Sequence, residues 1–320
     1  MKRLRLLPIL LVPSVVLGLA ACSGAASDDA STSASASASS SAAALSCLKP
    51  GAASKSITVA GDFGATTAPT VTFDKGLTAS SPQQSTVISG DGAKLTKTSY
   101  ISVSYSVYQA KTAEKLGSVG FDAGSPQVLS VGGTGFGTAL GCATVGSRIA
   151  VVGASDDLGF QTSGQIVVVA DILDTIATRS SGTPQTQDPA LPTVKDAADG
   201  EPTITIPDGY AAPEKTTTEV LKSGDGDTLT ADDTVFVQYK GEVVKSGKVF
   251  DSTWKRGAPT SFELSAVVPG FKDGLVGQKV GSQVLIVIPA DQGYGANPQE
   301  GSGIPKNADL LFVVDILAKG

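Results

Sequence analysis

Short hydrophobic runs separated by Gly, Pro and Asp recur along the chain. Three of the clearest are TVFVQY (234–239), VLIVIP (284–289) and LLFVVDIL (310–317), all rich in Val, Ile or Phe. Runs of this length and composition are typical of strands in an antiparallel sheet. The hydrophobic pattern therefore predicts folded parts in which strands dominate.

One segment has the spacing of a helix instead. In AVVPGFKDGLVGQ (266–278), Phe271 and Leu275 are four positions apart, and Pro269 stands where a helix would begin. Three glycines in the segment make it a poor helix by itself. We therefore expect a short helix that persists only against a sheet, which gives an α+β domain with several strands and one buried helix.

The pattern of the second half repeats that of the first. The segment TVISGDGAKLT (86–96) returns as EVLKSGDGDTLT (219–230), so that Gly224 follows Gly90 by 134 positions. Segments on either side keep nearly the same offset, including GFGTALGCATVGSRIAVVG at 135–153 and GFKDGLVGQKVGSQVLIVI at 270–288. A repeat of about 130 residues indicates two tandem domains, because solenoid repeats are typically about 20 to 50 residues long.

The N-terminal residues have the composition of an export signal. A basic start, MKRLR, precedes an apolar run and the residues LAAC, which resemble the bacterial lipobox at Cys22. The alternatives are an ordinary secreted protein and an uncleaved membrane helix, although the apolar run is shorter than the ~20 residues that span a bilayer. We expect a lipoprotein anchored through Cys22 to the outer face of the cell membrane.

These observations predict the following organisation. Residues 1–21 form a lipoprotein signal peptide, 22–46 a Ser/Ala-rich disordered tether, 47–177 the first copy, 178–200 a linker and 201–320 the second copy. The tether contains almost no large apolar residues and cannot offset its chain entropy by burial, although a weak helix in its Ala-rich part is the alternative. Cys47 and Cys142 remain after the anchor, and in an exported protein they suggest a disulfide, with buried free thiols as the alternative.

Composition excludes several classes of function. The chain of 320 residues has a net charge of −6, which argues against a nucleic-acid partner. It contains no histidine, so Ser-His-Asp triads and His-dependent metal sites are excluded, and its three cysteines have no zinc-binding spacing. The glycine-rich run at 132–141 lacks both common nucleotide-binding patterns. We therefore predict no metal and no cofactor.

The second copy carries a more specific pattern. Its Y-x-G, F-D-S, V-x-P-G-F, I-P-x-x-x-x-Y-G and I-P elements, followed by a strand with Phe, resemble the FKBP-type peptidyl-prolyl cis-trans isomerases over about 220–318. The resemblance implies an antiparallel sheet curled around one short helix, with an apolar pocket for a prolyl ring. With the repeat, it implies two tandem FKBP-like domains and an α+β fold.

The resemblance also implies the site. Phe271 would form the pocket floor, Asp251 would face the twisting amide, and Tyr294 and the backbone N–H of Val268 would bind substrate carbonyls. The remaining residues expected around the pocket are Tyr239, Phe250, Val267 and Phe312 on the walls, Arg256 paired with Asp251, and Ile304 closing one side. Taken singly, the aromatics are equally compatible with an ordinary core, and Asp251 with an Asx turn.

The first copy departs from this pattern. Tyr105, Phe121, Asp122 and Phe136 match the family, but Gly132 and Gly133 replace the two valines, Val168 stands at the position of Phe312, and the Y-G signature is lost around Gly159 and Phe160. We expect a degenerate FKBP-like domain with little or no isomerase activity.

The resemblance implies an isomerase that acts on X-Pro bonds of exported proteins. Its expected partners are X-Pro segments of unfolded or folding chains, the membrane through the lipid anchor, and macrolide immunosuppressants as ligands. A non-catalytic extracytoplasmic chaperone or peptide-binding lipoprotein is the alternative, in which both copies hold apolar peptides without turnover.

Overall fold

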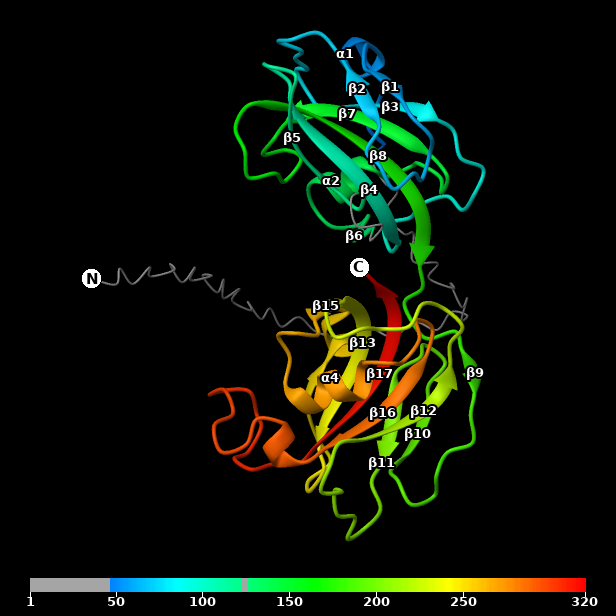
Figure 1. Ribbon diagram of the computed structural model, residues 1–320, viewed down its shortest axis with the longest axis vertical. Coiled ribbons are helices and arrows are strands. Elements are labelled where there is room, and N and C mark those ends of the chain that lie inside the picture. The colour runs from blue at the N-terminus through cyan, green and yellow to red at the C-terminus, as the bar shows by residue number, and fades with distance from the viewer. Residues whose placement is uncertain (1–46, 122–125) are drawn as a thin grey trace, which may run out of the picture. The chain divides into compact units, whose positions relative to one another are not determined.

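A computed structural model describes residues 47–121 and 126–320, which include both copies. The expected signal peptide, Cys22 and the tether lie outside the described residues, as does Asp122. No helix within the described ranges has the length and hydrophobicity needed to cross a membrane. Strands dominate both copies, as the α+β expectation requires (Figure 1).

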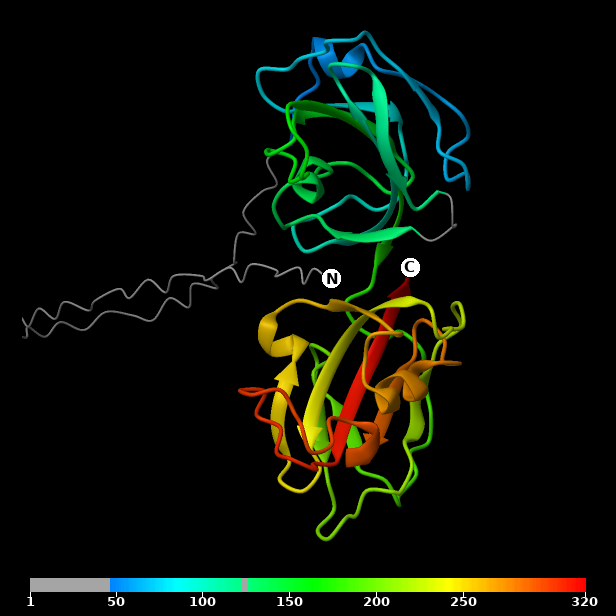
Figure 2. The same cartoon turned by 60° about the vertical axis from the view of Figure 1, so that its left-hand side comes forward.

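The second copy is built on one antiparallel sheet. Its strand order is β14-β13-β17-β16-β12-β9, and β15 pairs with β13. The strands are β9 (Thr183–Pro184), β12 (Thr217–Ser223), β13 (Thr234–Val243), β14 (Lys248–Ser252), β15 (Thr260–Glu263), β16 (Gln283–Ile288) and β17 (Leu310–Lys319). The long strands β13 and β17 run side by side in its middle (Figure 2).

The predicted helix is α4 (Pro269–Leu275), and it packs on β16. Two of its glycines explain how closely it does so. A Cβ added at Gly270 would lie 2.4 Å from Ile288 Cγ2, and one added at Gly274 would lie 2.6 Å from Ile286 Cγ2. Their low helix propensity is therefore offset by contact with the sheet, in which Phe271 and Leu275 become buried.

The segment expected to be a linker is folded onto the second sheet. Within 178–200, β9 pairs with β12, and β10 (Thr193–Asp196) pairs with β11 (Pro202–Thr205). The Ser180 N–H donates to Asp315 at 2.8 Å, and Lys222 forms an ion pair with Asp196. This corrects the predicted boundary, because residues 178–200 pack as part of the second copy.

Residues 178–200 pack here because the face of the sheet opposite α4 is apolar and must be covered. Leu285 and Val287 of β16 and Leu311 and Val313 of β17 point away from α4, and all four are fully buried. They pack with Val194 of β10 and with partly buried residues near β11. Runs of apolar residues without polar alternation are typical of strands buried on both faces, and the β10–β11 hairpin supplies the second cover.

The first copy repeats this plan. Its sheet has the order β3-β7-β8-β4-β5, with β6 paired to β4. The elements are α1 (Ala52–Lys55), β1 (Thr58–Ala60), β2 (Thr70–Thr72), β3 (Gln83–Ile88), β4 (Tyr100–Gln109), β5 (Glu114–Val119), β6 (Gln127–Ser130), α2 (Phe136–Ala139), β7 (Arg148–Ala154) and β8 (Gln165–Ile176). Residues next to the β1–β2 hairpin cover the face of this sheet that lies opposite α2.

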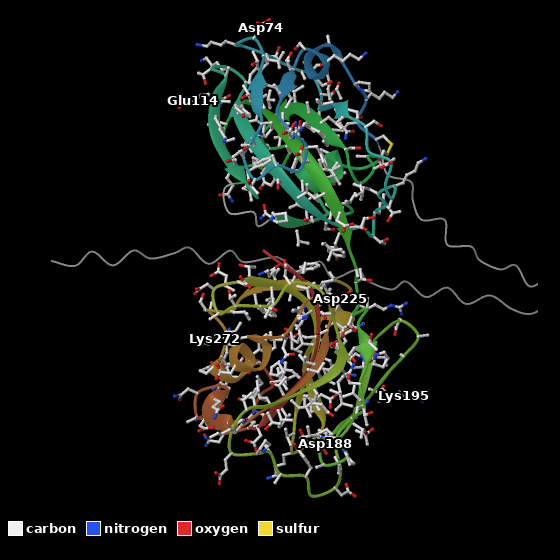
Figure 3. All side chains as sticks on the ribbon, turned by 45° about the vertical axis from the view of Figure 1, so that its right-hand side comes forward. Asp74, Glu114, Asp188, Lys195, Asp225 and Lys272 are labelled. Carbon is white, nitrogen blue, oxygen red and sulfur yellow. A yellow bond between two sulfur atoms is a disulfide. The ribbon has the colours of Figure 1, made fainter. Side chains whose placement is uncertain are left out.

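The doubled GDG motif is a close approach of two backbone segments in each copy. A Cβ added at Gly90 would lie 2.1 Å from the carbonyl oxygen of Val145, and one at Gly224 would lie 2.3 Å from that of Val280. The middle residue, Asp225 in the second copy, is exposed (Figure 3). The motif is therefore an architectural turn that precedes β4 and β13.

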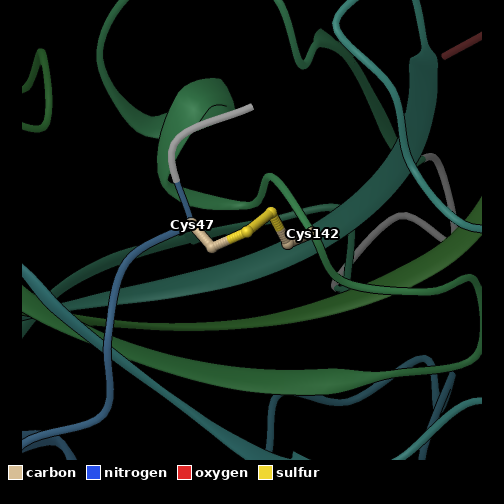
Figure 4. The surroundings of a disulfide bond; sticks show 2 residues. All are labelled: Cys47 and Cys142. Atoms are coloured by element: carbon tan, nitrogen blue, oxygen red, sulfur yellow. A yellow bond between two sulfur atoms is a disulfide. The ribbon is translucent and has the colours of Figure 1, made fainter. Parts of the chain in front are cut away.

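A disulfide joins Cys47 to Cys142 in the first copy. Cys47 begins the described part of the chain, and Cys142 follows α2 (Figure 4). The bond therefore connects the start of the segment that covers one face of the sheet to the helix on its other face.

Candidate functional site

A cavity of about 310 Å³ opens in the second copy over the face of the sheet that carries α4. We call it the aromatic cavity. It is lined by Tyr239, Phe250, Asp251, Phe262, Ala266, Val267, Val268, Phe271, Tyr294 and Phe312. Eight of these ten residues are site residues that the sequence predicts. The other two, Phe262 and Ala266, are additions from the structure.

Phe271 stands at the centre of the ring contacts. Its ring centroid lies 5.1 Å from that of Phe312, 5.8 Å from Phe262 and 6.4 Å from Tyr239, all in edge-to-face arrangements. Phe250 completes the wall at 5.4 Å from Phe312. Because Phe271 is on α4 while the other rings are on strands of the sheet, the cavity exists only when the helix is seated on that sheet.

The sequence analysis did not predict Phe262 as a site residue, although the alternation of its strand places it on the buried side. Thr260 stands two positions before Phe262 on the same strand. Residues two apart on a strand share a face, so Phe262 places its ring on the side of β15 that Thr260 also occupies. Its centroid lies 5.5 Å from that of Tyr239.

A polar cluster forms one edge of the cavity. The Tyr239 hydroxyl donates a hydrogen bond to Asp251, and Arg256 forms an ion pair with the same carboxylate. Arg256 Nη2 also donates to the Tyr239 hydroxyl at 3.2 Å. Burial, and after it the hydrogen bond to Asp251, raises the pKa of Tyr239 to about 12, so the hydroxyl stays protonated and donating at neutral pH.

Thr253 holds this edge in place. It is fully buried, its Oγ1 accepts from the Tyr239 N–H at 2.8 Å, and it donates to the Tyr239 carbonyl oxygen at 3.1 Å. Ser252, one residue earlier, caps α3 (Thr253–Arg256) by accepting from the Lys255 N–H. Within the sequence FDST, Asp251 therefore supplies the carboxylate, Ser252 caps α3, and Thr253 holds the backbone of β13.

Two hydrogen-bond donors at the cavity have no acceptor among the described residues. One is the hydroxyl of Tyr294, whose side chain is 39% exposed at the end of the η1 turn (Ala290–Gln292). The other is the backbone N–H of Val268, which precedes α4. Burial, and then the charge of Asp251, raises the pKa of Tyr294, which keeps its proton on the hydroxyl.

Two predicted site residues lie outside the cavity wall. Arg256 acts from the rim through Asp251 and Tyr239, and its side chain is 45% exposed. Ile304 does not line the cavity as expected; it is buried in the hydrophobic core of the second copy, and its backbone N–H donates to Ser302 Oγ. Gly303, just before it, has φ +75°, a left-handed conformation that favours glycine.

The equivalent space in the first copy is occupied by its own side chains. The Phe160 ring lies 5.6 Å from Phe136 and 6.2 Å from Tyr105, and these two rings are 5.2 Å apart. Phe160 follows Gly159 as Tyr294 follows Gly293, but it has no hydroxyl. The Tyr105 hydroxyl donates to Gln127 Oε1 at 2.9 Å.

Strand pairing identifies the other missing wall residue. Val107 of β4 pairs with Val168 of β8, and the corresponding residues of the second copy are Gly241 and Phe312. A valine therefore occupies the position of the Phe312 ring. The first copy retains the sheet and helix but lacks the ring, the hydroxyl donor and the paired valines.

No metal site accompanies the aromatic cavity. Within 47–121 and 126–320, no group of three or more Cys, Asp or Glu side chains is arranged to hold a metal ion. What the cavity offers chemically is an apolar surface with a carboxylate at its edge and two unused donors.

Comparison with known proteins shows that residues 226–317 match the family of FKBP-type peptidyl-prolyl cis-trans isomerases. FkpA of Escherichia coli strain K12, an FKBP-type isomerase, is 40% identical over 99 residues, which are 31% of this chain and 36% of FkpA. The chain thus spans about a third of the length of that relative. A crystal structure of E. coli FkpA matches 39% of this chain and 51% of its own, at 34% identity and a TM-score of 0.31.

Two smaller relatives are matched almost completely. The FK506-binding protein of Streptomyces anulatus is 35% identical over 120 residues, 37% of this chain and 96% of that protein. A probable FK506-binding protein of Corynebacterium glutamicum is 34% identical over 119 residues, 37% of this chain and 98% of that protein. Over the folded part that carries the aromatic cavity, the chain therefore belongs to the FKBP-type peptidyl-prolyl cis-trans isomerase family.

Proposed function

We propose that the aromatic cavity of the second copy catalyses cis-trans isomerisation of X-Pro peptide bonds. The observation that supports this most directly is the pair of unused donors, Val268 N–H and Tyr294 hydroxyl, beside an aromatic floor. A prolyl ring on Phe271 would bring the carbonyl groups on either side of it within reach of these donors. Family membership supports the same activity.

The chemistry requires neither a nucleophile nor a cofactor. Rotation about an X-Pro bond loses amide resonance against a barrier of about 18–20 kcal/mol, and it takes about tens to hundreds of seconds unaided. The twisted amide has less charge separation than the planar amide. An apolar cavity therefore disfavours the planar ground state, and fixed donors hold the substrate backbone in the twisted geometry.

In this proposal each polar group has a distinct task. Tyr294 and Val268 bind substrate carbonyls, whereas Asp251 faces the rotating amide. Arg256 and Tyr239 position the Asp251 carboxylate, because both interact with it. Thr253 acts one step further away by fixing the backbone of Tyr239.

Substitution of the cavity's polar groups tests the activity. In the full chain, Asp251→Asn is expected to lower kcat/KM for an X-Pro peptide by about tenfold, since a hydrogen bond to a charged group is worth about 1.5–3 kcal/mol. Asp251→Asn combined with Tyr294→Phe should lower it further. The measurement is a protease-coupled or NMR exchange assay.

The first copy provides the control for this experiment. Tyr105→Phe removes the hydroxyl that corresponds to Tyr239, and it should leave kcat/KM within about twofold of the parent value. Unchanged activity in the Asp251/Tyr294 double variant would exclude the catalytic proposal. The non-catalytic peptide-binding role would then be favoured.

We further propose that exported proteins are the substrates and that the first copy is not catalytic. The self-filled space around Phe160 supports the second point. FK506, the ligand named for the Streptomyces relative, is a candidate ligand of the aromatic cavity. The LAAC motif supports export with a lipid anchor on Cys22, on the outer face of the cell membrane.

The anchor can be tested separately from the activity. Cells that express the chain and are fed a radioactive fatty acid should label it, and Cys22→Ala should remove that label and release the protein from the membrane fraction. Isomerase activity in the released protein should persist. Equal labelling of the Cys22→Ala variant would show that the cysteine is not the acylation site.

A further inference from the structure

A second cleft opens on the opposite face of the sheet, and nothing in the proposed reaction uses it. Its volume is about 700 Å³, and we call it the acidic cleft. It lies between the loop after β11, the β13–β14 hairpin and the start of β17. Its lining comprises Ile204, Ile206, Pro207, Asp208, Gly209, Tyr210, Ala211, Ala212, Glu242, Val244, Lys245, Ser246, Gly247 and Asp309.

Glu242 is the unusual member of this set. It is only 5% exposed, yet its carboxylate accepts no hydrogen bond from any described residue. The nearest cation, Lys240, lies 4.0 Å away and is held by the Pro202 carbonyl oxygen at 2.9 Å and by Glu201 at 3.3 Å. Glu242 lines the cleft, and its carboxylate has no hydrogen-bond donor among the described residues, so it is free to accept hydrogen bonds from a ligand.

A second polar group of the cleft also lacks a partner. The hydroxyl of Tyr210 is buried and makes no hydrogen bond to any described residue, although the ring packs on the apolar cluster behind the sheet. Glu242 and Tyr210 come from different elements, one from β13 and one from the loop after β11. Their convergence on one cleft is therefore a property of the tertiary structure.

In the first copy, the position that corresponds to Glu242 is covered by the chain's own residues. Strand pairing places Tyr108 at the position of Glu242. The Tyr108 ring packs against Phe73 at 6.1 Å, and the Gly76 N–H donates directly to the Ala110 carbonyl oxygen at 3.0 Å. The second copy has a carboxylate instead of the ring, and its described loop makes no corresponding bond to Val244.

The charges and apolar walls of the cleft favour a ligand that has a cationic group at the end of an aliphatic chain. Among the lining residues, Glu242, Asp208 and Asp309 are acidic and Lys245 is basic, and Lys240, whose ammonium lies 4.0 Å from Glu242, is a second base beside the cleft. Acidic groups therefore outnumber basic ones, while Ile204, Ile206 and Val244 supply apolar walls. A guanidinium matches a carboxylate with two parallel N–H donors, and its methylene stem can cover apolar surface. The cleft is also larger than one side chain requires.

We propose that the acidic cleft binds an arginine side chain of an extended polypeptide segment. Glu242 of β13 and Val244 just after it face away from α4, whereas Tyr239 of β13 faces the aromatic cavity. The two sites therefore lie on opposite faces of the sheet and can be occupied independently. The cleft is a second contact for polypeptides, selected by charge and not by proline.

Binding of a proline-free peptide tests the proposal without involving the aromatic cavity. Isothermal titration of the full chain would use a blocked pentapeptide with leucines flanking a central arginine. The control is the same peptide with citrulline in place of arginine, which keeps the shape of the side chain and removes its charge. The citrulline peptide should bind at least about tenfold more weakly, since one charge-assisted pair accounts for about that factor.

Three variants locate the site. Glu242→Gln and Ala211→Trp, which fills the cleft from an exposed position, should each weaken arginine-peptide binding at least about tenfold, with isomerase activity retained as the check on folding. Asp251→Asn should leave the binding unchanged. Equal binding of both peptides, full binding to both cleft variants, or loss of binding in Asp251→Asn would each overturn the proposal, and none of these results bears on the isomerase activity.

Discussion

Replacing Phe271 with Ala is expected to remove measurable isomerase activity and to lower the free energy of unfolding of the second copy by about 3–5 kcal/mol. Phe271 is 4% exposed and contacts Tyr239, Phe262 and Phe312. Its loss removes both the floor of the aromatic cavity and the main contact of α4 with the sheet. Because α4 and the residues just after it contain three glycines, the helix has little stability of its own to offset this loss.

Denaturant unfolding followed by tryptophan fluorescence measures this effect. Trp254 is the single tryptophan and lies in α3 of the second copy, so its signal reports on that copy. Activity would be compared at a temperature where fluorescence shows the variant to be folded. Near-normal activity in folded Phe271→Ala would contradict the role given to the ring.

Phe136→Ala is the matched variant in the first copy. Phe136 occupies the corresponding place on α2 and packs with Tyr105 and Phe160. Its loss should destabilise the first copy to a similar extent but leave kcat/KM for X-Pro peptides close to that of the parent chain. A large fall in activity would mean that the first copy contributes to catalysis.

Removing the Cys47–Cys142 disulfide is expected to lower the free energy of unfolding of the first copy by about 4–5 kcal/mol. The two cysteines are 95 positions apart, and the chain-entropy model gives about this value for so long a loop. Without the bond, the segment that begins at Cys47 is no longer held beside α2, and the cover of the sheet's second face is more easily lost.

The measurement uses a Cys47→Ala/Cys142→Ala double variant, which leaves no unpaired thiol at either site. Hydrogen exchange with mass spectrometry should show faster exchange in peptides from β4, β7 and β8. Peptides from β13 and β17 provide the internal reference. Unchanged protection across the first sheet would show that the packing of Ala53 and Ile57 alone suffices to hold the segment.

The covering segment has a further attachment in the first copy. Arg148 and Asp171 form a fully buried ion pair, and Arg148 donates to the carbonyl oxygens of Gly61 and Asp62 at 2.7 and 2.8 Å. Gln283 and Asp315 occupy the corresponding positions in the second copy, where Gln283 donates to Asp315 at 2.8 Å. Burial raises the pKa of Asp315. The two copies thus attach similar covers by different polar contacts.

Local patterns accounted for much of the site. Motif spacing identified eight of the residues that line the aromatic cavity. Each lies on or beside a strand, a turn or the helix, and the residues around it in the sequence are enough to predict that element. Phe262 was missed because no motif singled it out, and only the pairing of β15 with β13 brings its ring beside Tyr239. Ile304 does not line the cavity but lies in the same hydrophobic core as Phe271 and Phe312.

The pairing of residues 178–200 with the second sheet was not predicted, for a different reason. Polar and proline residues between 178 and 200 are typical of linkers, and that composition gave no sign of β9 or β10. The unbroken apolar runs of β16 and β17 did carry a signal, because strands with two apolar faces need a cover on both sides. What supplies that cover depends on contacts between residues more than 80 positions apart, such as Gln283 with Asp196.

The sequence by itself determined the repeated motifs, the dominance of strands, the short helix that carries Phe271, and the order of the cavity residues, since these follow from periodicity, turn chemistry and motif spacing. Only the tertiary structure decided that Phe160 fills the first cavity, that Val268 and Tyr294 keep unused donors in the second, and that Glu242 meets Tyr210 at the acidic cleft. Those features depend on which distant side chains share a space and which polar groups find no partner there. Neither property can be read from neighbouring positions along a chain.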